Sequence, residues 1–302
     1  MAATGGKVLD TILETRGVVK RYGGQPVLDR VDLEVGRGEA VGLVGPNGAG
    51  KTTLIKVSLG LARRDGGRVL LNGLDPWREP RAREGVGVVF ERPNLPSSMP
   101  VVEFLESAAA IYGSSPSRVD WAIRAAGLEG HEWKTFPQLS AGLKQRAAIA
   151  HALLGEPRFL VADEPTSNLD PLERREVLRL LARLNREHGL SLLVSSHVIV
   201  ELLRVATRIY VLAGGRLAAK GSPEDLFRRA GLARLRTSNP SLAAEILGSL
   251  GFEAREDGLG VVVRVDGPLH RFYEALARLG REGVEVLGVD LVEPAVEEAM
   301  AG

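Results

Sequence analysis

The chain has 302 residues, a formal net charge of +1, a hydrophobic content of 44% and no cysteine. This length and composition allow one large domain with a sizeable core and one smaller domain, and they exclude a disordered chain. The lack of cysteine excludes disulfides and thiolate metal sites. The sequence has no run of about 18 apolar residues and no apolar secretion signal near its start, so we expect a soluble or peripheral protein.

The first chemical signal follows a short apolar run at residues 40–44, which predicts a buried strand. The nine residues after this run fit the pattern G-x-x-x-x-G-K-[ST] in a strand–loop–helix context, and they are Gly45, Pro46, Asn47, Gly48, Ala49, Gly50, Lys51, Thr52 and Thr53. We call these residues the phosphate loop. Glycines are needed there because backbone N–H groups must converge on phosphate oxygens, and a Cβ would block their approach. The alternative, a plain glycine turn, gives no reason for the Lys-Thr pair after the last glycine.

Each functional group of the phosphate loop has a predicted role. Lys51 is expected to reach the β and γ phosphates of a nucleotide, and the hydroxyl of Thr52 is expected to ligate Mg²⁺. The helix that begins near Thr52 adds the positive end of its dipole, on the order of half an elementary charge.

A second signal is the apolar run at residues 159–162, which ends in the acidic pair Asp163 and Glu164. The run predicts a buried parallel strand, and the acids then lie at its carboxyl end, where the ligand sites of α/β sheets form. Asp163 is expected to hold the same Mg²⁺ as the phosphate loop, directly or through water.

These two segments resemble the ATP-binding-cassette (ABC) ATPases, the nucleotide-hydrolysing subunits of ABC transporters. The resemblance covers about residues 8 to 225, with further motifs in the order of the family. Tyr22, before two glycines, stands where the family places an aromatic residue that stacks on adenine. It also fits an ordinary aromatic at the end of a strand. Ser195-Ser196-His197 resembles the strand of the switch histidine.

Two more segments match motifs through which the family completes the site of a neighbouring subunit. Residues 139–143, Leu-Ser-Ala-Gly-Leu, form the signature segment, and residues 167–170, Ser-Asn-Leu-Asp, form the cross-dimer loop. Ser140 is expected to cap the following helix and to contact the γ-phosphate of the partner's ATP, with Gly142 allowing close approach. Asp170 is expected to reach the nucleotide site and, because Pro171 follows it, also to start a helix.

The resemblance implies an α/β fold, a P-loop NTPase domain of ABC type over residues 1–225 with a helical insert at about residues 92–150. It also implies a mechanism in which two subunits sandwich two ATP molecules. Glu164 is the candidate general base, a role that contributes about 10² to 10⁴ in rate. His197 contacts the γ-phosphate and orients the attacking water, and Lys51 is the third catalytic residue.

The sequence departs from the family pattern at two places. The signature is usually Leu-Ser-Gly-Gly-Gln, but Ser140 and Gly142 are kept here, so we expect function to persist. At the position of a glutamine that senses Mg²⁺ and faces the membrane subunit, this chain has Glu91. We expect Glu91 to ligate the metal, which makes the enzyme more dependent on Mg²⁺. The alternative is an exposed loop acid beside Arg92.

The helical insert begins with a proline-rich loop at residues 93–100 and continues with a helix near residues 102–112. In the family this insert and the Glu91 loop receive a short helix from the membrane partner, so docking is expected here. The alternative is a helical cap over the sheet.

Residues 226–302 predict a small accessory domain with the element order β-α-β-β-α-β, a ferredoxin-like arrangement. The expected strands lie near residues 233–237 and 284–289, with a strand pair around residues 258–260 whose hairpin turn is supplied by Asp257-Gly258 and Gly260. Helices are expected near residues 242–250 and 270–279, and a closing helix at 292–300. This tail resembles those of ABC-2-type exporter ATPases, which implies export and a regulatory or dimer-supporting role. The alternative is a generic accessory domain.

The predicted function is therefore that of the ATPase subunit of an ABC exporter, with ATP and Mg²⁺ as cofactors. The expected partners are a transmembrane permease subunit and a second ATPase subunit, identical or paralogous, at the cytoplasmic face of the cell membrane. Nucleic acid is not an expected partner, because the sequence shows no basic stripe. The alternative function is a soluble ABC ATPase in translation or DNA repair. Those proteins carry two cassettes or a long coiled-coil insert, and this chain has neither.

Overall fold

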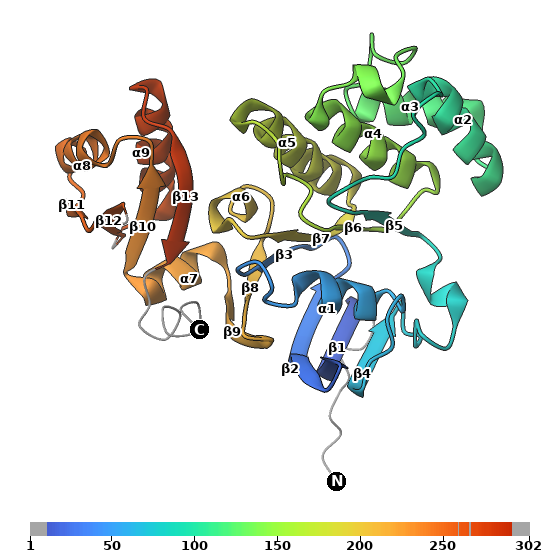
Figure 1. Cartoon of the computed structure of the whole chain (residues 1–302), viewed down its shortest axis with the longest axis horizontal. Coiled ribbons are helices and arrows are strands. Elements are labelled where there is room, and N and C mark those ends of the chain that lie inside the picture. The colour runs from blue at the N-terminus through green and yellow to red at the C-terminus, as the bar shows by residue number, and fades with distance from the viewer. Residues whose placement is uncertain (1–10, 259, 266, 292–302) are drawn as a thin grey trace.

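The computed structural model describes residues 11–258, 260–265 and 267–291 (Figure 1). Its strands are β1 (Thr11–Tyr22), β2 (Gln25–Gly36), β3 (Ala40–Val44), β4 (Gly66–Leu71), β5 (Val86–Val89), β6 (Phe159–Ala162), β7 (Ser191–Ser196), β8 (Arg208–Ala213), β9 (Arg216–Gly221), β10 (Leu232–Thr237), β11 (Ala254–Glu256), β12 (Val261–Arg264) and β13 (Val286–Leu291). Its helices are α1 (Lys51–Ser58), α2 (Val101–Tyr112), α3 (Pro116–Ala125), α4 (Ala141–Leu154), α5 (Pro171–His188), α6 (Ile199–Leu202), α7 (Pro223–Ala230), α8 (Pro240–Ser249) and α9 (Leu269–Arg281), with 3₁₀ turns η1 (Pro80–Arg83) and η2 (Phe136–Gln138).

The central sheet has the strand order β5-β6-β7-β3-β8-β9, and all neighbours are parallel except β8 and β9. Every residue of β3, β6 and β7 is buried. Continuous apolar runs form these strands because both faces of a parallel sheet are covered. The predicted strands at residues 40–44 and 159–162 are confirmed as β3 and β6.

Alternate residues of the central strands face two different cores. Ala40 and Val44 of β3 pack in one core with α4 and α5, whereas Val41 and Leu43 pack in the other with α1 and the sheet of order β2-β1-β4. Figure 1 shows this sandwich, with α4 and α5 on one side of the central sheet and α1 with the antiparallel strands on the other. The sheet is therefore held rigidly from both faces, and its strand ends are fixed in place.

Helices α2, α3 and α4 form the helical region, which contributes Leu105, Ala122 and Ile149 to the core shared with α5. Helix α2 ends at Gly113, whose φ of 69° lies in the left-handed region that glycine adopts at helix ends. The predicted helix near residues 102–112 is confirmed.

The last sheet has the order β11-β12-β10-β13 with every pair antiparallel, and its elements follow one another as β-α-β-β-α-β. The strand pair expected around residues 258–260 is observed as the antiparallel pair β11 and β12. In the turn between them, Asp257 donates its backbone N–H to the carbonyl of Gly260. Phe227 of α7 contacts Phe272 of α9, with ring centroids 5.6 Å apart, so this unit packs on the end of α7. The predicted closing helix at 292–300 lies outside the described residues.

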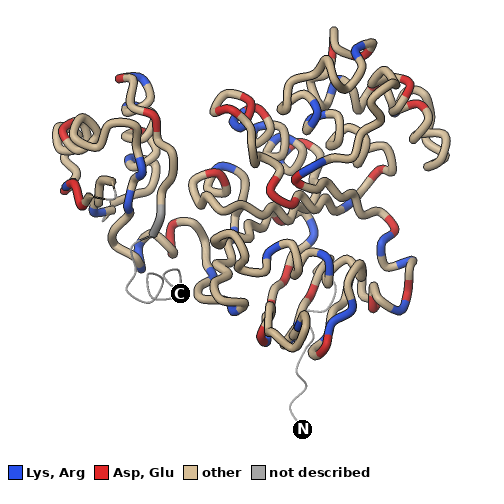
Figure 2. Tube along the Cα trace, in the orientation of Figure 1, with Lys and Arg blue, Asp and Glu red and all other residues tan. Residues whose placement is uncertain are grey.

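None of the helices in the described part of the chain has both the length and the apolar character that are needed to cross a bilayer. Acidic and basic residues are interspersed along the described chain, as Figure 2 shows.

Candidate functional site

Three segments with predicted catalytic residues meet at one edge of the central sheet, where β3, β6 and β7 end. Strand β7 lies between the other two, with Val44 opposite Ser196 and Ala162 opposite Val194. The phosphate loop, the pair Asp163 and Glu164, and His197 follow these strand ends. The carboxyl edge of a parallel sheet is where α/β folds bind ligands, and the register makes these segments neighbours.

The phosphate loop has the backbone that the sequence predicts. Gly48 and Gly50 have φ values of 83° and 104°, in the left-handed region that side chains disfavour. A Cβ at Gly45 would lie 2.1 Å from the carbonyl oxygen of Leu212, so only glycine fits this first position. Helix α1 begins at Lys51, one residue before the expected start at Thr52. The loop therefore presents its backbone N–H groups at the helix N-terminus, as an anion site requires.

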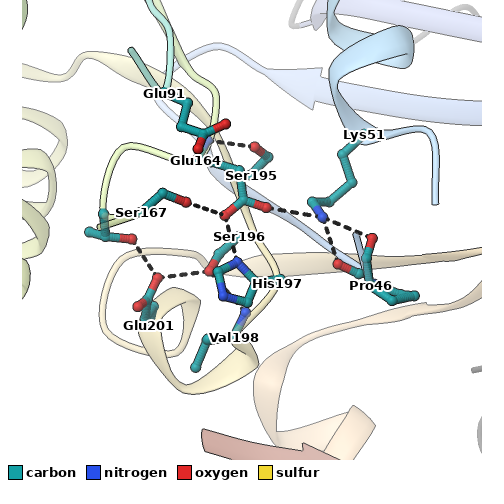
Figure 3. A network of polar contacts seen from close by, with 12 residues as sticks. Pro46, Lys51, Glu91, Glu164, Ser167, Ser195, Ser196, His197, Val198 and Glu201 are labelled. Atoms are coloured by element: carbon teal, nitrogen blue, oxygen red, sulfur yellow. Dashed lines mark hydrogen bonds and ion pairs between the residues drawn. The ribbon is translucent and has the colours of Figure 1, made fainter. Parts of the chain in front are cut away.

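Lys51 is buried, and its ammonium group points back over the loop. Its Nζ donates to the carbonyl oxygens of Gly45 at 2.6 Å and Pro46 at 3.1 Å, and it lies 3.0 Å from Oε1 of Glu164 (Figure 3). A buried carboxylate is thus the counter-ion of Lys51. The same ammonium group is placed to accept a phosphate as counter-ion, because it lies at the mouth of the loop.

Glu164 is the centre of a cluster with Lys51, Ser167 and His197, which we call the Glu164 cluster. Its Oε2 lies 2.9 Å from Nδ1 of His197 and accepts a hydrogen bond of 3.3 Å from the Ser167 hydroxyl. Burial by itself raises the pKa of Glu164, but the hydrogen bonds from His197 and Lys51 outweigh it and lower the pKa below its ordinary value. The carboxylate is therefore ionised at neutral pH, as a general base must be.

The backbone of Glu164 is held in an unusual conformation, with a φ of 48°. A non-glycine residue in this region is strained, and such residues cluster at functional sites. The Ser195 hydroxyl fixes it: this oxygen accepts from the backbone N–H of Glu164 at 2.8 Å and donates to Oδ1 of Asp163 at 2.7 Å. Sequence reasoning gave Ser195 no role of its own. The sequence feature that could have revealed this role is a serine at the end of an apolar strand, here the strand that pairs with β6.

Replacing Ser195 with alanine is expected to remove both hydrogen bonds, so that the buried carboxylate of Asp163 loses a hydrogen-bond donor. The expected cost is about 1–3 kcal/mol in the free energy of unfolding, together with a roughly tenfold loss of ATP turnover. Urea unfolding and steady-state kinetics measure the two effects. Ser191→Ala is the matched control, because Ser191 lies on the same strand and, among the described residues, its side chain has a single hydrogen bond, which it accepts from the backbone N–H of Gly38. An equal loss of turnover in both variants would contradict the role of Ser195.

The oxygen groups at this edge fit Mg²⁺. Asp163 is buried at the end of β6, and Thr52 is an exposed residue in the first turn of α1. Among the residues that the structure describes, no three His, Asp or Glu side chains gather into a group that could hold a metal alone. Mg²⁺ in nucleotide sites is held by one or two protein oxygens together with the phosphates, so a hydroxyl and a carboxylate are a suitable set. Thr52 and Asp163 would be the ligands.

Glu91 follows β5, which pairs in parallel with β6, so it lies at the same edge as Asp163. It is exposed, and its Oε1 lies 3.5 Å from Nδ2 of Asn168 in the cross-dimer loop. This contact links the Glu91 loop to the cross-dimer loop.

The remaining predicted residues are Tyr22, Ser140, Gly142 and Asp170. No hydrogen bond or ion pair of the described residues joins them to the Glu164 cluster. Tyr22 ends β1 with half of its surface exposed, and the ammonium of Lys20 lies 4.7 Å from its ring centroid. The ring is thus accessible for stacking.

The side chains of Ser140 and Asp170 cap helices. Ser140 accepts from the backbone N–H of Leu143, and Asp170 accepts from two N–H groups at the start of α5. The predicted helix start at Asp170 is confirmed. A Cβ on Gly142 would lie 2.8 Å from the side chain of Glu173, so this glycine is needed for packing inside the chain. Sequence reasoning had given only the approach of a phosphate as its reason.

Comparison with known proteins agrees with this geometry. Residues 28–167 match the family described as "ABC transporter". The chain is 39% identical to the Nod factor export ATP-binding protein I of Cupriavidus pinatubonensis, over 72% of this chain and 68% of that one. It is 35% identical to the bacitracin transport ATP-binding protein BcrA of Enterococcus faecalis, over 80% of each.

A solved structure gives the same result for the fold. The chain superposes on cbiO1 from Clostridium perfringens, described as part of the ABC transporter complex cbiONQ, with a TM-score of 0.68 and 29% identity. The match covers 80% of this chain and 97% of that one. The phosphate loop, the acidic pair and the switch histidine lie at one sheet edge, and close relatives extend over most of the chain. The chain therefore belongs to the ABC transporter family, as an ATP-binding subunit of P-loop fold that hydrolyses ATP with Mg²⁺.

Proposed function

We propose that this subunit powers a membrane exporter by closing and opening a dimer around two ATP molecules, and that the predicted site residues carry the chemistry. The observation that supports this most strongly is the Glu164 cluster, in which a buried base contacts both the phosphate-loop lysine and the switch histidine.

In this proposal Lys51 exchanges partners. Its ammonium group lies 3.0 Å from Glu164, and it would pair with the β and γ phosphates when a nucleotide binds. The pKa of Glu164 then rises, because a cation that lowers it has moved away. Glu164 becomes a stronger base at the moment when water is to be deprotonated, and His197 keeps it oriented through Nδ1. Mg²⁺, when bound, neutralises negative charge on the phosphates.

The signature segment and the cross-dimer loop are proposed to complete the site of a second copy. Ser140 is exposed at the start of α4, and Asp170 is exposed at the start of α5. Both helix N-termini carry a positive partial charge, which suits contact with the phosphates of the neighbour's ATP. Among the described residues, no hydrogen bond or ion pair joins these groups to the Glu164 cluster of their own chain, so in this proposal one copy supplies only part of each site.

The direction of transport and the membrane partner follow from the relatives. Two of them are named for export of Nod factor and for transport of bacitracin, and a third is part of a larger transporter complex. We therefore propose export through a transmembrane permease subunit at the cytoplasmic face of the membrane. Phe90 before Glu91 is an exposed apolar side chain, and so are Ile111 and Tyr112 on α2. Exposed apolar groups at the Glu91 loop and on the helical insert suit docking of a permease helix.

The proposed domain boundary between residues 225 and 226 falls inside α7. Ser222 caps α7 and Phe227 packs against the following unit, so α7 joins the two parts instead of separating them. We propose that residues 226–302 act as an accessory domain whose position is coupled to the ATPase domain through this helix.

Replacing Glu91 with glutamine is expected to weaken the dependence of turnover on Mg²⁺ by several-fold, because a neutral amide attracts the ion less than a carboxylate does. Phosphate release measured against free Mg²⁺ tests this. The control is Glu84→Gln, which changes an exposed acid before β5. If turnover and the Mg²⁺ requirement both stay unchanged in Glu91→Gln, the metal-linked role is wrong.

Co-purification from detergent extracts tests the transport function as a whole. The tagged chain is expected to retain a polytopic membrane protein, and this partner is expected to stimulate its Mg²⁺-dependent ATP hydrolysis. Stimulation by ribosomes or DNA ends instead, without a membrane partner, would contradict transport.

A further inference from the structure

Glu201 is a buried acid for which neither the motifs nor the proposed chemistry gives a use. It lies on the short helix α6, with 6% of its surface exposed. Its Oε2 accepts a hydrogen bond from the hydroxyl of Ser196 at 2.7 Å (Figure 3) and another from the hydroxyl of Thr166 at 2.6 Å. Its Oε1 lies 3.1 Å from Nε of Arg174. Removing a charge from water is costly, so a carboxylate with three such partners indicates a specific role.

The three partners of Glu201 adjoin two predicted functional segments, the cross-dimer loop and the turn that carries His197. Thr166 directly precedes the cross-dimer loop and lies two residues after Glu164. Ser196 directly precedes His197, and its hydroxyl also accepts from the backbone N–H of Val198, so it shapes the turn that carries the histidine. Arg174 lies in the first turns of α5, and its guanidinium also donates to the carbonyl oxygen of Leu169 in the cross-dimer loop at 3.4 Å.

Only an ionised acid satisfies all three groups at once. Two hydroxyls donate to the same oxygen of Glu201, and the cation of Arg174 lies against the other. A glutamine has one acceptor oxygen and one NH₂ donor, so it would keep the hydroxyls or the cation but not both. A carboxylate at position 201 is therefore required by its hydrogen-bond and charge partners, and not only by the space that the side chain fills.

We propose that Glu201 is a positioning residue that fixes the switch histidine and the cross-dimer loop relative to each other. This inference rests on the proposed function, in which His197 acts on the nucleotide of its own chain and the cross-dimer loop acts on the neighbour. A shift of the turn that carries His197 moves the carboxylate of Glu201 and with it the cross-dimer loop, and a shift of the cross-dimer loop moves His197 in the same way. Glu201 therefore couples the chemistry at one site to the contact with the second subunit.

The first test compares Glu201→Gln with the wild-type chain at saturating ATP and Mg²⁺. We expect kcat to fall about tenfold, because small misplacements of catalytic groups have effects of this size or larger. KM and the affinity for a non-hydrolysable nucleotide are expected to change less than about twofold, since the phosphate loop is untouched. The matched control is Glu187→Gln, which alters an exposed acid near the end of α5 and is expected to leave kcat unchanged.

The second test is a double-mutant cycle with Thr166→Val and Ser196→Ala, which keeps Glu201 in place. The two losses of kcat are expected to be non-additive, because both hydroxyls act through one oxygen. An unchanged kcat in Glu201→Gln, a loss of nucleotide affinity as large as the loss of kcat, or additive effects in the cycle would overturn the proposal. These outcomes differ from a failure of the proposed function, in which the wild-type chain itself releases no phosphate from ATP.

Discussion

Glutamine in place of Glu164 is expected to lower ATP turnover by about 10² to 10⁴-fold, the usual contribution of a general base. The substitution keeps the size of the side chain and an acceptor for the Ser167 hydroxyl, but removes the charge that activates water. Steady-state phosphate release measures the loss. Glu187→Gln on α5 is the control, and it is expected to keep wild-type turnover.

The same variant is also expected to accumulate as an ATP-bound dimer. Removing the negative charge of Glu164 relieves its repulsion from the γ-phosphate, and without hydrolysis nothing opens the sandwich. Size-exclusion chromatography with and without ATP and Mg²⁺ detects the dimer. A variant that remains monomeric with ATP and keeps wild-type turnover would falsify the assignment of Glu164.

Alanine in place of Lys51 is expected to have the second large effect, a fall in turnover by about 10² to 10³-fold with a loss of nucleotide affinity. The ammonium group is the cation at the mouth of the phosphate loop, and no other Lys or Arg of the described residues forms an ion pair with Glu164. Isothermal titration with ATP and phosphate-release assays measure the two losses. Lys56→Ala, an exposed lysine on the same helix, is the control.

Lys51→Ala is further expected to destabilise the nucleotide-free chain in a pH-dependent way. Burial raises the pKa of Glu164, and the hydrogen bonds from His197 and Lys51 lower it below its ordinary value. A lowered pKa stabilises the fold above the pKa of the unfolded chain, and this stabilisation is lost as pH falls. Without Lys51 the stabilisation shrinks, so the melting temperature is expected to drop more at pH 7 than at pH 4. An equal drop at both values would show that Lys51 does not act through Glu164.

Much of the central sheet and of the nucleotide site was predictable, because local patterns determine them. Buried parallel strands are short and continuously apolar, so residues 40–44 and 159–162 were located correctly, and the glycines of the phosphate loop have the backbone that their spacing predicts. The acids at the end of β6 were placed at the correct sheet edge for the same reason.

The supporting contacts were not predictable, because they depend on which strands are neighbours. The contacts of Ser195 with Glu164 and of Glu201 with Thr166 form only when β7 lies beside β6, and that pairing joins residues more than 30 positions apart. A polar residue at the end of an apolar run does not reveal its partner. The packing of Glu173 on Gly142 likewise depends on how α4 and α5 approach each other.

The extent to which one copy is incomplete is the central question of the mechanism. Lys51 and Glu164 lie together in a single chain, whereas Ser140 only caps its own helix. The account requires that Ser140 of one copy faces the ATP held by the phosphate loop of another. Aspartate at position 140 keeps the helix cap but places a negative charge against that ATP.

Mixing two inactive variants, Lys51→Ala and Ser140→Asp, tests this most directly. A mixed dimer contains one intact site, made from the phosphate loop of the second variant and the signature segment of the first. The account predicts that turnover, nearly absent in each variant alone, returns on mixing and rises with protein concentration. A mixture that forms ATP-dependent mixed dimers but is no more active than its components would contradict it.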